Sequence, residues 1–200
     1  FRNASYRPSR SILCIALIAV ATFIIVSVDV FRREGELSLD RQSGVGGFAL
    51  LAEASLPLYH NPNTVQGKEG LNLTRDAAAS LEKVTFSRLR LRPGDDASCL
   101  NLYRPHNPRI LGAPADFGTE GRFSFHSSLA ATEKEKENPW LLLESRTSDG
   151  AIPAIADATS MAYVLHVGLG EEIVLDSGGQ EPVRLKLVAA LSDSVLQGEL

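Results

Sequence analysis

The side chains with the greatest capacity for chemistry in this chain are its 4 histidines and 2 cysteines. Zinc sites are built from such residues at short, regular spacings. None of the histidines lies three or four residues from another His, Cys or Glu; they are His60, His106, His126 and His166. We therefore expect no metal-binding residues.

A second candidate for chemistry is the segment 95–99, which reads Asp-Asp-Ala-Ser-Cys. Paired carboxylates can transfer protons, and a thiolate can act as a nucleophile. However, Asp after Pro93-Gly94 is typical of turns and caps, and the sequence offers no identifiable base for Cys99. A Gly-x-Ser-x-Gly elbow and a phosphate-binding P-loop are also absent from the sequence. We expect no catalytic and no cofactor-binding residues, and no enzyme activity.

Composition narrows the class of protein further. The net charge of −4 gives no reason to expect a nucleic-acid partner. Cys14 lies in a long apolar run and Cys99 lies outside it, so the two are not expected to form a disulfide. Cys99 is expected to be a small buried residue. An apolar content of 44% is ordinary and supports one domain or two small subdomains.

The apolar run covers residues 11–28 and contains no charged side chain. A membrane-crossing helix needs about 20 mostly apolar residues. A buried core helix would show a polar stripe, which this run lacks. A cleaved signal peptide is shorter and ends at a small-x-small site, whereas Ala19 and Ala21 lie inside the run. A pilin-type helix would bury the arginines that precede the run, at a large cost. We expect a permanent membrane span.

The charges around the run predict its orientation. Arg2, Arg7 and Arg10 precede it without an acid, whereas Arg32 and Arg33 follow it among acids. This modest excess of basic residues favours a cytoplasmic N-terminus. The expected organisation is a basic cytoplasmic lead-in at 1–10, a transmembrane helix at 11–28, a linker at 29–47 and an extracytoplasmic domain at 48–200.

The first half of that domain mixes strand and helix patterns. An apolar run predicts a buried strand over 48–52, and Thr74 can cap a helix over 75–84. Arginine and leucine alternate over 86–92, which predicts a strand with one wet and one buried face. The arginines could form a phosphate-binding surface, but a solvated face is the stronger interpretation. The charge run 132–138 predicts a solvated loop or a subdomain boundary.

The second half shows a similar mixture. We expect residues 140–143 to be buried, a short strand over 152–155, and a helix that Asp157 caps and that continues to about Leu165. The chain should end in a β-hairpin, with strands over 169–175 and 183–188 around a turn at 177–180. The predicted fold class is therefore α+β: one N-terminal transmembrane helix and a mixed domain of one or two subdomains that ends in a hairpin.

Both ends of the chain resemble a known family. Arg2-Asn3-Ala4 and Arg7-Pro8-Ser9-Arg10-Ser11 before the apolar run are similar to the entry into a membrane helix of FtsX-like, MacB-type ABC transporter permeases. Residues 167–175 and 183–191 are similar to the hairpin of the family's periplasmic domain, although Ala189-Ala190 stands where the family usually has glycine. Residues 91–102 resemble a subset of large bacterial permeases, whereas residues 55–150 match no general pattern of the family.

The resemblance implies a permease fragment in a bacterial inner membrane with a periplasmic core domain. In the hairpin it implies that Gly170 makes the turn into a strand and that the acid after it faces solvent. The implied partners are a cytoplasmic ABC ATPase, a periplasmic adaptor, the lipid bilayer and a second permease half, and the implied role is export or mechanotransmission driven by ATP hydrolysis on the ATPase. The alternative is a membrane-anchored extracytoplasmic domain that senses a ligand. An anchored periplasmic enzyme would need a catalytic constellation, which the sequence does not show.

Overall fold

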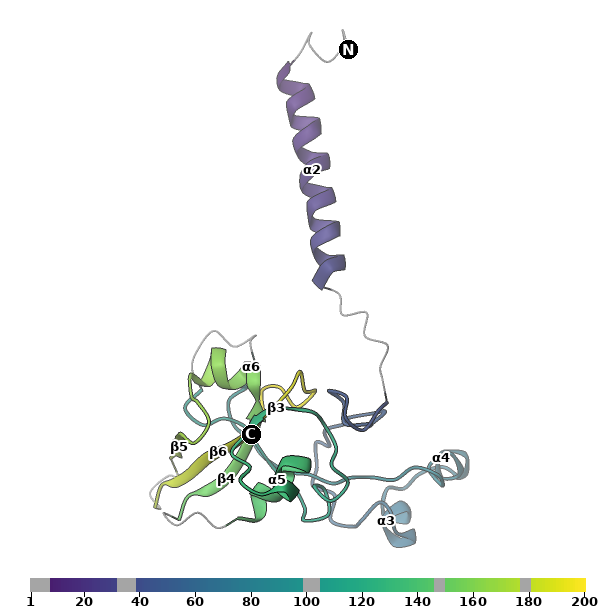
Figure 1. Cartoon of the computed structure of the whole chain (residues 1–200). Coiled ribbons are helices and arrows are strands. Elements are labelled where there is room, and N and C mark those ends of the chain that lie inside the picture. The colour runs from purple at the N-terminus through teal and green to yellow at the C-terminus, as the bar shows by residue number, and fades with distance from the viewer. Residues whose placement is uncertain (1–7, 32–38, 99–104, 146–149, 177–180) are drawn as a thin grey trace. The chain divides into compact units, whose positions relative to one another are not determined.

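The computed structural model describes residues 8–31, 39–98, 105–145, 150–176 and 181–200. The chain divides into two compact units, Phe1–Leu37 and Ser38–Leu200. The first unit contains helix α2, and the second contains all other elements that the structure describes (Figure 1). We refer to the second unit as the domain. The structure does not confirm a division of the domain into two subdomains.

Helix α2 runs from Pro8 to Phe31. Its segment Ser9–Val28 is long and apolar enough to cross a membrane, and none of it is buried inside the protein. The Thr22 hydroxyl donates a hydrogen bond to the Ile18 carbonyl at 2.8 Å, so this polar group is satisfied within the helix. A membrane anchor and a signal sequence share these properties. The predicted apolar helix of spanning length is thus confirmed.

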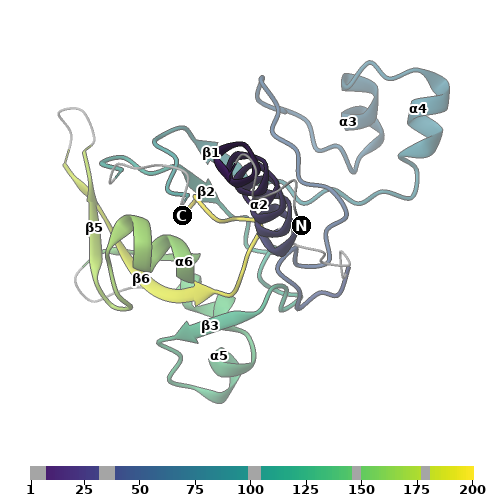
Figure 2. The same ribbon diagram turned by 90° about the horizontal axis from the view of Figure 1, so that it is seen from above.

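The domain is built around one long strand, β6 (Val183–Leu191). Strand β4 (Ile152–Asp157) pairs with it in parallel, while β3 (Phe125–Ser128) and β5 (Glu172–Leu175) pair with it antiparallel. The sheet order is β3-β6-β4, with β5 also on β6. Figure 2 shows β3 and β5 beside β6. Strand β6 therefore contacts every other strand of this sheet. The mixture of helices and sheets agrees with the predicted class.

The C-terminal hairpin has the predicted alternation. Leu185 and Leu187 are 4% and 0% exposed, whereas Arg184 is exposed and Lys186 is half-buried. The strand continues three residues beyond the predicted end, and every residue from Leu187 to Leu191 is buried. Alternation is lost there because the sheet is covered on both faces, as expected of a central strand. The turn predicted at 177–180 lies outside the described residues.

Each face of β6 contributes to a different core. One core packs Met161, Val164 and Leu165 against β4 and β6. The helical residues come from α6 (Ala158–Ser160) and from a π-helical turn, η2 (Met161–Leu165). The other core is aromatic and contains Phe117, Phe123 and Trp140. The rings of Phe117 and Trp140 meet edge to face at 5.1 Å, a preferred geometry for aromatic pairs.

A second, smaller sheet pairs β1 (Arg90–Arg92) with β2 (Ile110–Gly112). Leu200 lies beside this sheet. The Leu111 amide donates to the Leu200 carbonyl at 2.6 Å, and the Leu200 amide donates to the Arg109 carbonyl at 3.0 Å. Leu200 is 8% exposed and belongs to the same core as β6. The two sheets of the domain therefore share one core.

Two short helices lie between residues 63 and 86, α3 (Val65–Gly70) and α4 (Arg75–Ser80). The Asn63 side chain closes this segment, since its amide donates to the Phe86 carbonyl at 2.8 Å and its oxygen accepts from the Phe86 amide at 2.7 Å. Lys68 Nζ donates to the Leu81 carbonyl at 3.1 Å and joins the two helices. We call residues 63–86 the clamped loop.

Several expected elements differ from the observed ones. Residues 48–52 form no strand, and Leu50 and Leu51 are 82% and 55% exposed. An apolar run forms a strand only where a neighbouring strand pairs with its backbone, and none of the described strands does so here. Residues 40–47 were expected to belong to the linker, but the Phe123 amide donates to the Arg41 carbonyl at 2.7 Å and the Val195 amide to the Gly44 carbonyl at 2.8 Å.

Three further elements have different lengths or types. The helix expected over 75–84 ends at Ser80, although Thr74 caps it as predicted; short helices without a packed face are marginal. The arginine-leucine strand is reduced to β1, but its arginines are exposed as expected. The charge run forms a helix, α5 (Glu133–Glu137), because Thr132 and Glu135 make a reciprocal capping box. The hydrogen bonds from the Thr132 and Ala131 amides lower the pKa of Glu135.

The burial predicted for residues 140–143 is confirmed at two of the four positions, whereas Leu141 and Leu143 are half-buried. Trp140 and Leu142 are each 6% exposed in a 3₁₀ helix, η1 (Pro139–Glu144). The predicted cap of the next helix is also confirmed, because the Asp157 carboxylate accepts a hydrogen bond from the Thr159 amide at 2.9 Å. That helix ends at Leu165, as expected, but only after changing from α to π geometry.

Candidate functional site

The acids of segment 95–99 organise the loop in which they lie. Asp95 accepts hydrogen bonds from the His106 and Asn107 amides, both at 3.2 Å. Asp96 accepts from the Ser98 amide at 2.9 Å and from the Ser98 hydroxyl at 2.6 Å. The turn chemistry predicted for this segment is thus confirmed. Cys99, expected to be buried, lies outside the described residues.

The histidines are not brought together. No group of three or more His, Cys, Asp or Glu side chains suited to a metal ion occurs among the described residues. His60 and His106 are exposed in loops. His126 lies on β3, and His166 ends η2 with φ 53°. Only the last two lie near the same surface feature, a pocket beside α6.

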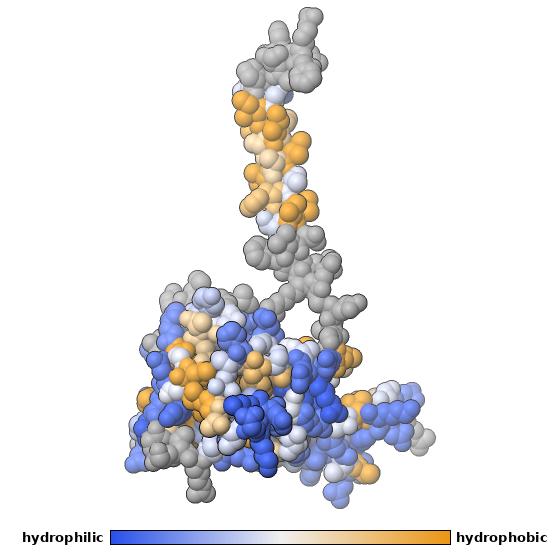
Figure 3. All heavy atoms as spheres, viewed as in Figure 1, coloured by the Kyte–Doolittle hydropathy of each residue, from blue (hydrophilic) through white to orange (hydrophobic). Residues whose placement is uncertain are grey.

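This pocket is a hollow on the surface that is largely open to solvent, with a volume of about 330 Å³ and a mostly apolar lining. The side chains that line it come from β3, from α6 and η2, from the following loop and from β6: His126, Ser127, Ala158, Met161, Ala162, Val167, Leu169 and Ala190. Six of the eight are apolar, and His126 and Ser127 supply the polar groups. Figure 3 shows apolar atoms gathered on this face of the domain, around α6 and β6. A mostly apolar hollow with a few polar groups is the usual form of a small-molecule site.

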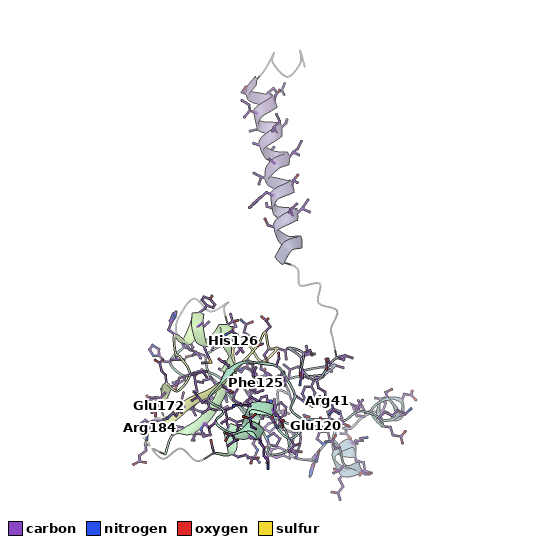
Figure 4. The ribbon with its side chains drawn as sticks, in the orientation of Figure 1. Arg41, Glu120, Phe125, His126, Glu172 and Arg184 are labelled. Carbon is purple, nitrogen blue, oxygen red and sulfur yellow. The ribbon has the colours of Figure 1, made fainter. Side chains whose placement is uncertain are left out.

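A β-bulge gives the pocket its polar side. Phe125 pairs with Leu191 and Ser127 pairs with Ala190, so His126 is an extra residue in the strand. Neighbouring residues of a regular strand face opposite sides of a sheet. Here His126 and Ser127 both line the pocket, while Phe125 contacts Trp140 in the aromatic core. Figure 4 labels the neighbouring residues Phe125 and His126. The bulge therefore directs two consecutive polar side chains into one hollow.

The helical wall of the pocket is fixed at both ends. The buried Asp157 carboxylate accepts from the Thr159 and Ser194 amides at 2.9 and 2.8 Å. The buried Ser160 hydroxyl accepts from the Gly198 amide at 3.1 Å. At the far end, the His166 ring lies 3.2 Å from the Ala162 carbonyl. These contacts hold Ala158, Met161 and Ala162 in place against the sheet.

The wall also carries two backbone irregularities. Residues Met161–Leu165 are π-helical, and His166 adopts a left-handed conformation. Single π-helical turns are rare and occur frequently at functional sites. Left-handed non-glycine residues cost about 1–2 kcal/mol and need support from their surroundings. With the bulge at His126, this makes three departures from regular geometry around one pocket.

A separate charged group lies beside the smaller sheet. Arg109 contacts Glu53 at 2.8 Å and Glu199 at 3.3 Å. Burial raises the pKa of Glu199, and the charge of Arg109 partly opposes this. The hydrogen bond that Arg109 donates to Glu53 raises the pKa of Arg109. These ion pairs hold residues 53, 109 and 199 together, so we assign this charged group a structural role.

No family model, curated protein or solved structure matches this chain.

The pocket could not be predicted from the sequence. In the sequence, His126 is a candidate only for metal binding, and Met161 is a candidate only for packing in the hydrophobic core. Nothing in the sequence around Phe125 marks a bulge, because a bulge depends on the register with β6, which lies about sixty residues further along the chain. The one local signal is the helix cap at Asp157, which places Ala158 and Ala162 near the start of the helical wall.

Proposed function

We propose that this chain is part of a membrane-anchored transport protein, an FtsX-like permease of an ABC transporter, and that the domain is its extracytoplasmic part. In this role α2 crosses the inner membrane of a bacterium and the domain follows outside the cytoplasm. The domain contacts a substrate or an adaptor and transmits motion driven by a separate cytoplasmic ATPase. It acts in a dimer of permease halves and performs no chemistry of its own.

The observation that carries the proposal is the agreement between the hairpin and the family pattern it resembles. The pattern implies a glycine that turns the chain into a strand and an acid after it that faces solvent. Gly170 has φ 83°, Glu171 is exposed, and β5 begins at Glu172. The return strand is the central strand of the main sheet. The resembling segment is thus the framework of the domain.

The position of α2 gives further support. Its apolar segment ends at Val28, ten residues before the domain begins at Ser38. A membrane helix that precedes an extracytoplasmic domain in the chain is the order that the family resemblance implies.

The second candidate is a ligand-sensing domain on the same anchor. The pocket between β3, α6 and β6 favours it, since a sensor needs a binding site and a coupling domain does not. The two candidates differ in the segments expected after Leu200 in the full-length protein. A permease continues into several further apolar spans, whereas a sensor continues into one span and a signalling domain.

The proposal is tested by purifying the full-length protein from the membranes of its source organism and identifying the proteins that accompany it. We expect an ATP-hydrolysing partner, and loss of export when either protein is deleted. Tyr59 and Leu56 are 86% and 77% exposed, so they can be replaced without disturbing the core, and in this proposal they contact a partner. Tyr59→Ser and Leu56→Ser should lower export at an unchanged melting temperature. A partner without ATPase activity, and normal export after deletion, would favour the sensor.

A further inference from the structure

We propose that the pocket binds a short aliphatic chain ending in a carboxylate or carbonyl oxygen, with His126 and Ser127 as donors to that oxygen. The inference concerns the pocket alone and holds whether the domain serves a permease or a sensor. It rests on the shape of the pocket, on the chemistry of its lining and on the unusual backbone that forms it.

The lining selects an aliphatic ligand. The floor and walls consist of alanine, valine, leucine and methionine side chains, and among the described residues no Phe, Tyr or Trp ring lines the pocket. Three of the lining residues are alanines, Ala158, Ala162 and Ala190, which leave room where larger side chains would fill the space. Met161 is unbranched and adapts its shape to the groups that it contacts. A volume of about 330 Å³ lies at the small end of the range of ligand sites.

The two polar side chains of the lining indicate that one end of the ligand carries a hydrogen-bond acceptor. The Ser127 hydroxyl and the protonated ring nitrogen of His126 both donate hydrogen bonds. Among the described residues neither side chain has a hydrogen-bond partner within the protein, and both line the pocket. A ligand oxygen at the mouth would accept from both while its chain lies on the apolar floor. A cationic head group could be met only by the lone pairs of the Ser127 oxygen and of the ring nitrogen of His126 that carries no proton, so the comparison of the two head groups tests which role these side chains play.

The construction of the pocket argues against a chance surface hollow. A regular strand would place only one of His126 and Ser127 on this face, and the bulge places both. The opposite wall is held by the buried carboxylate of Asp157 and the buried hydroxyl of Ser160. A rigid wall preserves the site in the absence of a ligand, which lowers the entropic cost of binding.

The chain offers a built-in probe, because Met161 is its only methionine. With methyl-¹³C methionine, the full chain in lipid nanodiscs gives one NMR signal from the floor of the pocket. If expression adds a start methionine, its signal is recognised in two ways. The ligand does not shift it, and it remains in the spectrum of the Met161→Leu protein. The probe ligand is octanoate, and octylammonium, with the same chain and a cationic head, is the comparison.

We expect octanoate to shift the Met161 signal saturably and to bind about tenfold more tightly than octylammonium. Ala162→Leu fills the pocket and should abolish the shift. Tyr163→Leu is the matched control, since Tyr163 lies on the same turn, is 73% exposed and does not line the pocket; it should bind octanoate normally. His126→Leu should weaken octanoate binding about tenfold and remove the preference over octylammonium, as loss of one hydrogen bond to a charged group predicts.

Three results would overturn the proposal. The first is a Met161 signal that octanoate does not shift at millimolar concentration. The second is an equal shift in the Ala162→Leu protein, which would indicate an effect of the lipid or of another site. The third is an unchanged preference for octanoate in the His126→Leu protein, which would remove the assigned role of His126. The melting temperature of each variant shows whether the protein is folded.

Discussion

The polar side chains of this protein fall into two groups: some stabilise the backbone of the fold, and others face the solvent. Asp95, Asp96 and Asp157 all use their carboxylates to accept backbone hydrogen bonds. Such acids stabilise loops and helix ends and are not free for proton transfer. The sequence predicted this role because Asp after Pro-Gly, or before an alanine-rich helix, is typical of turns and caps. It did not predict the role of His126, which depends on pairing with a distant strand.

The first prediction concerns burial in β6. Leu187 is fully buried, so Leu187→Asp places an unpaired charge in the core and should prevent stable folding. Val174→Asp is the matched control, because Val174 is 57% exposed on the partner strand and lies opposite Arg184. It should change the free energy of unfolding by less than about 1 kcal/mol. Chemical denaturation measures the free energy of unfolding of both variants. Equal losses of stability would contradict the observation that Leu187 is buried and Val174 is exposed.

The second prediction concerns the pH dependence of stability at Glu199. Burial raises the pKa of Glu199 in the folded protein above that in the unfolded chain. Between the two values the folded protein holds a proton that the unfolded chain has released, so stability falls as the pH rises through this interval. Glu53 and Asp96 also raise the pKa, whereas Arg109 lowers it.

Glu199→Gln removes this titrating group. Melting temperatures of the variant measured from about pH 4 to pH 7 should therefore fall less steeply with rising pH than those of the wild type. Glu133→Gln is the control, because the Glu133 side chain is 86% exposed in α5. It should leave the slope unchanged. A steeper fall in the Glu199→Gln protein would show that the ion pair with Arg109 outweighs burial.

Elements were predictable where their signals are local. The hairpin over β5 and β6, the cap at Asp157, the cap at Thr74 and the apolar α2 follow from alternation, capping residues and length. The predictions that failed concern segments whose structure depends on contacts with other residues. The run at 48–52 has strand composition but none of the described strands beside it, and the charge run became a helix through one capping box. The smaller sheet and the pocket likewise depend on contacts between distant segments, which no local pattern encodes.

The third prediction concerns the turn into β5. Gly170 has φ 83°, and an alanine there adopts a strained left-handed conformation although no atom blocks its Cβ. Gly170→Ala should destabilise the domain by about 1–2 kcal/mol. Gly168→Ala is the matched control two residues earlier, where φ is not positive and the contacts are ordinary. Equal melting temperatures for the two variants would show that this turn carries no strain.

The fourth prediction concerns α2. Leu17 lies near the middle of the apolar segment, so Leu17→Arg should reduce membrane insertion by about 2.5–3.5 kcal/mol on insertion scales. Leu56→Arg, at an exposed position of the domain, should leave insertion unchanged. Carbonate extraction of membranes separates inserted from soluble protein. Full insertion of the Leu17→Arg protein would argue against a spanning helix.

At the scale of the whole molecule, the chain consists of an apolar helix of spanning length and an α+β domain with two hydrophobic cores, one on each face of β6. The sequence predicted both parts and their order. It placed the boundary later than the structure does, since residues 40–47 contact the domain. Those contacts involve Arg41 and Gly44, whose partners near residues 123 and 195 are far away in sequence.

The fifth prediction concerns topology. If α2 spans the membrane with its N-terminus inside, a reporter fused after Gly47 in place of the domain should be active only if it functions outside the cytoplasm. Alkaline phosphatase should therefore be active at this site and a cytoplasm-dependent fluorescent protein should be dark. The opposite pattern would reverse the orientation. Release of the reporter from the membrane would identify α2 as a cleaved signal sequence.

The closure of the clamped loop has a consequence for the changes of length that the domain can tolerate. Asn63 joins the two ends of residues 63–86 much as one rung of an antiparallel ladder would. The chain therefore leaves and re-enters the domain at nearly the same point. We therefore expect changes of length between these ends to leave the main sheet in place. Replacing residues 64–85 by a short glycine link tests whether the remaining domain folds unchanged.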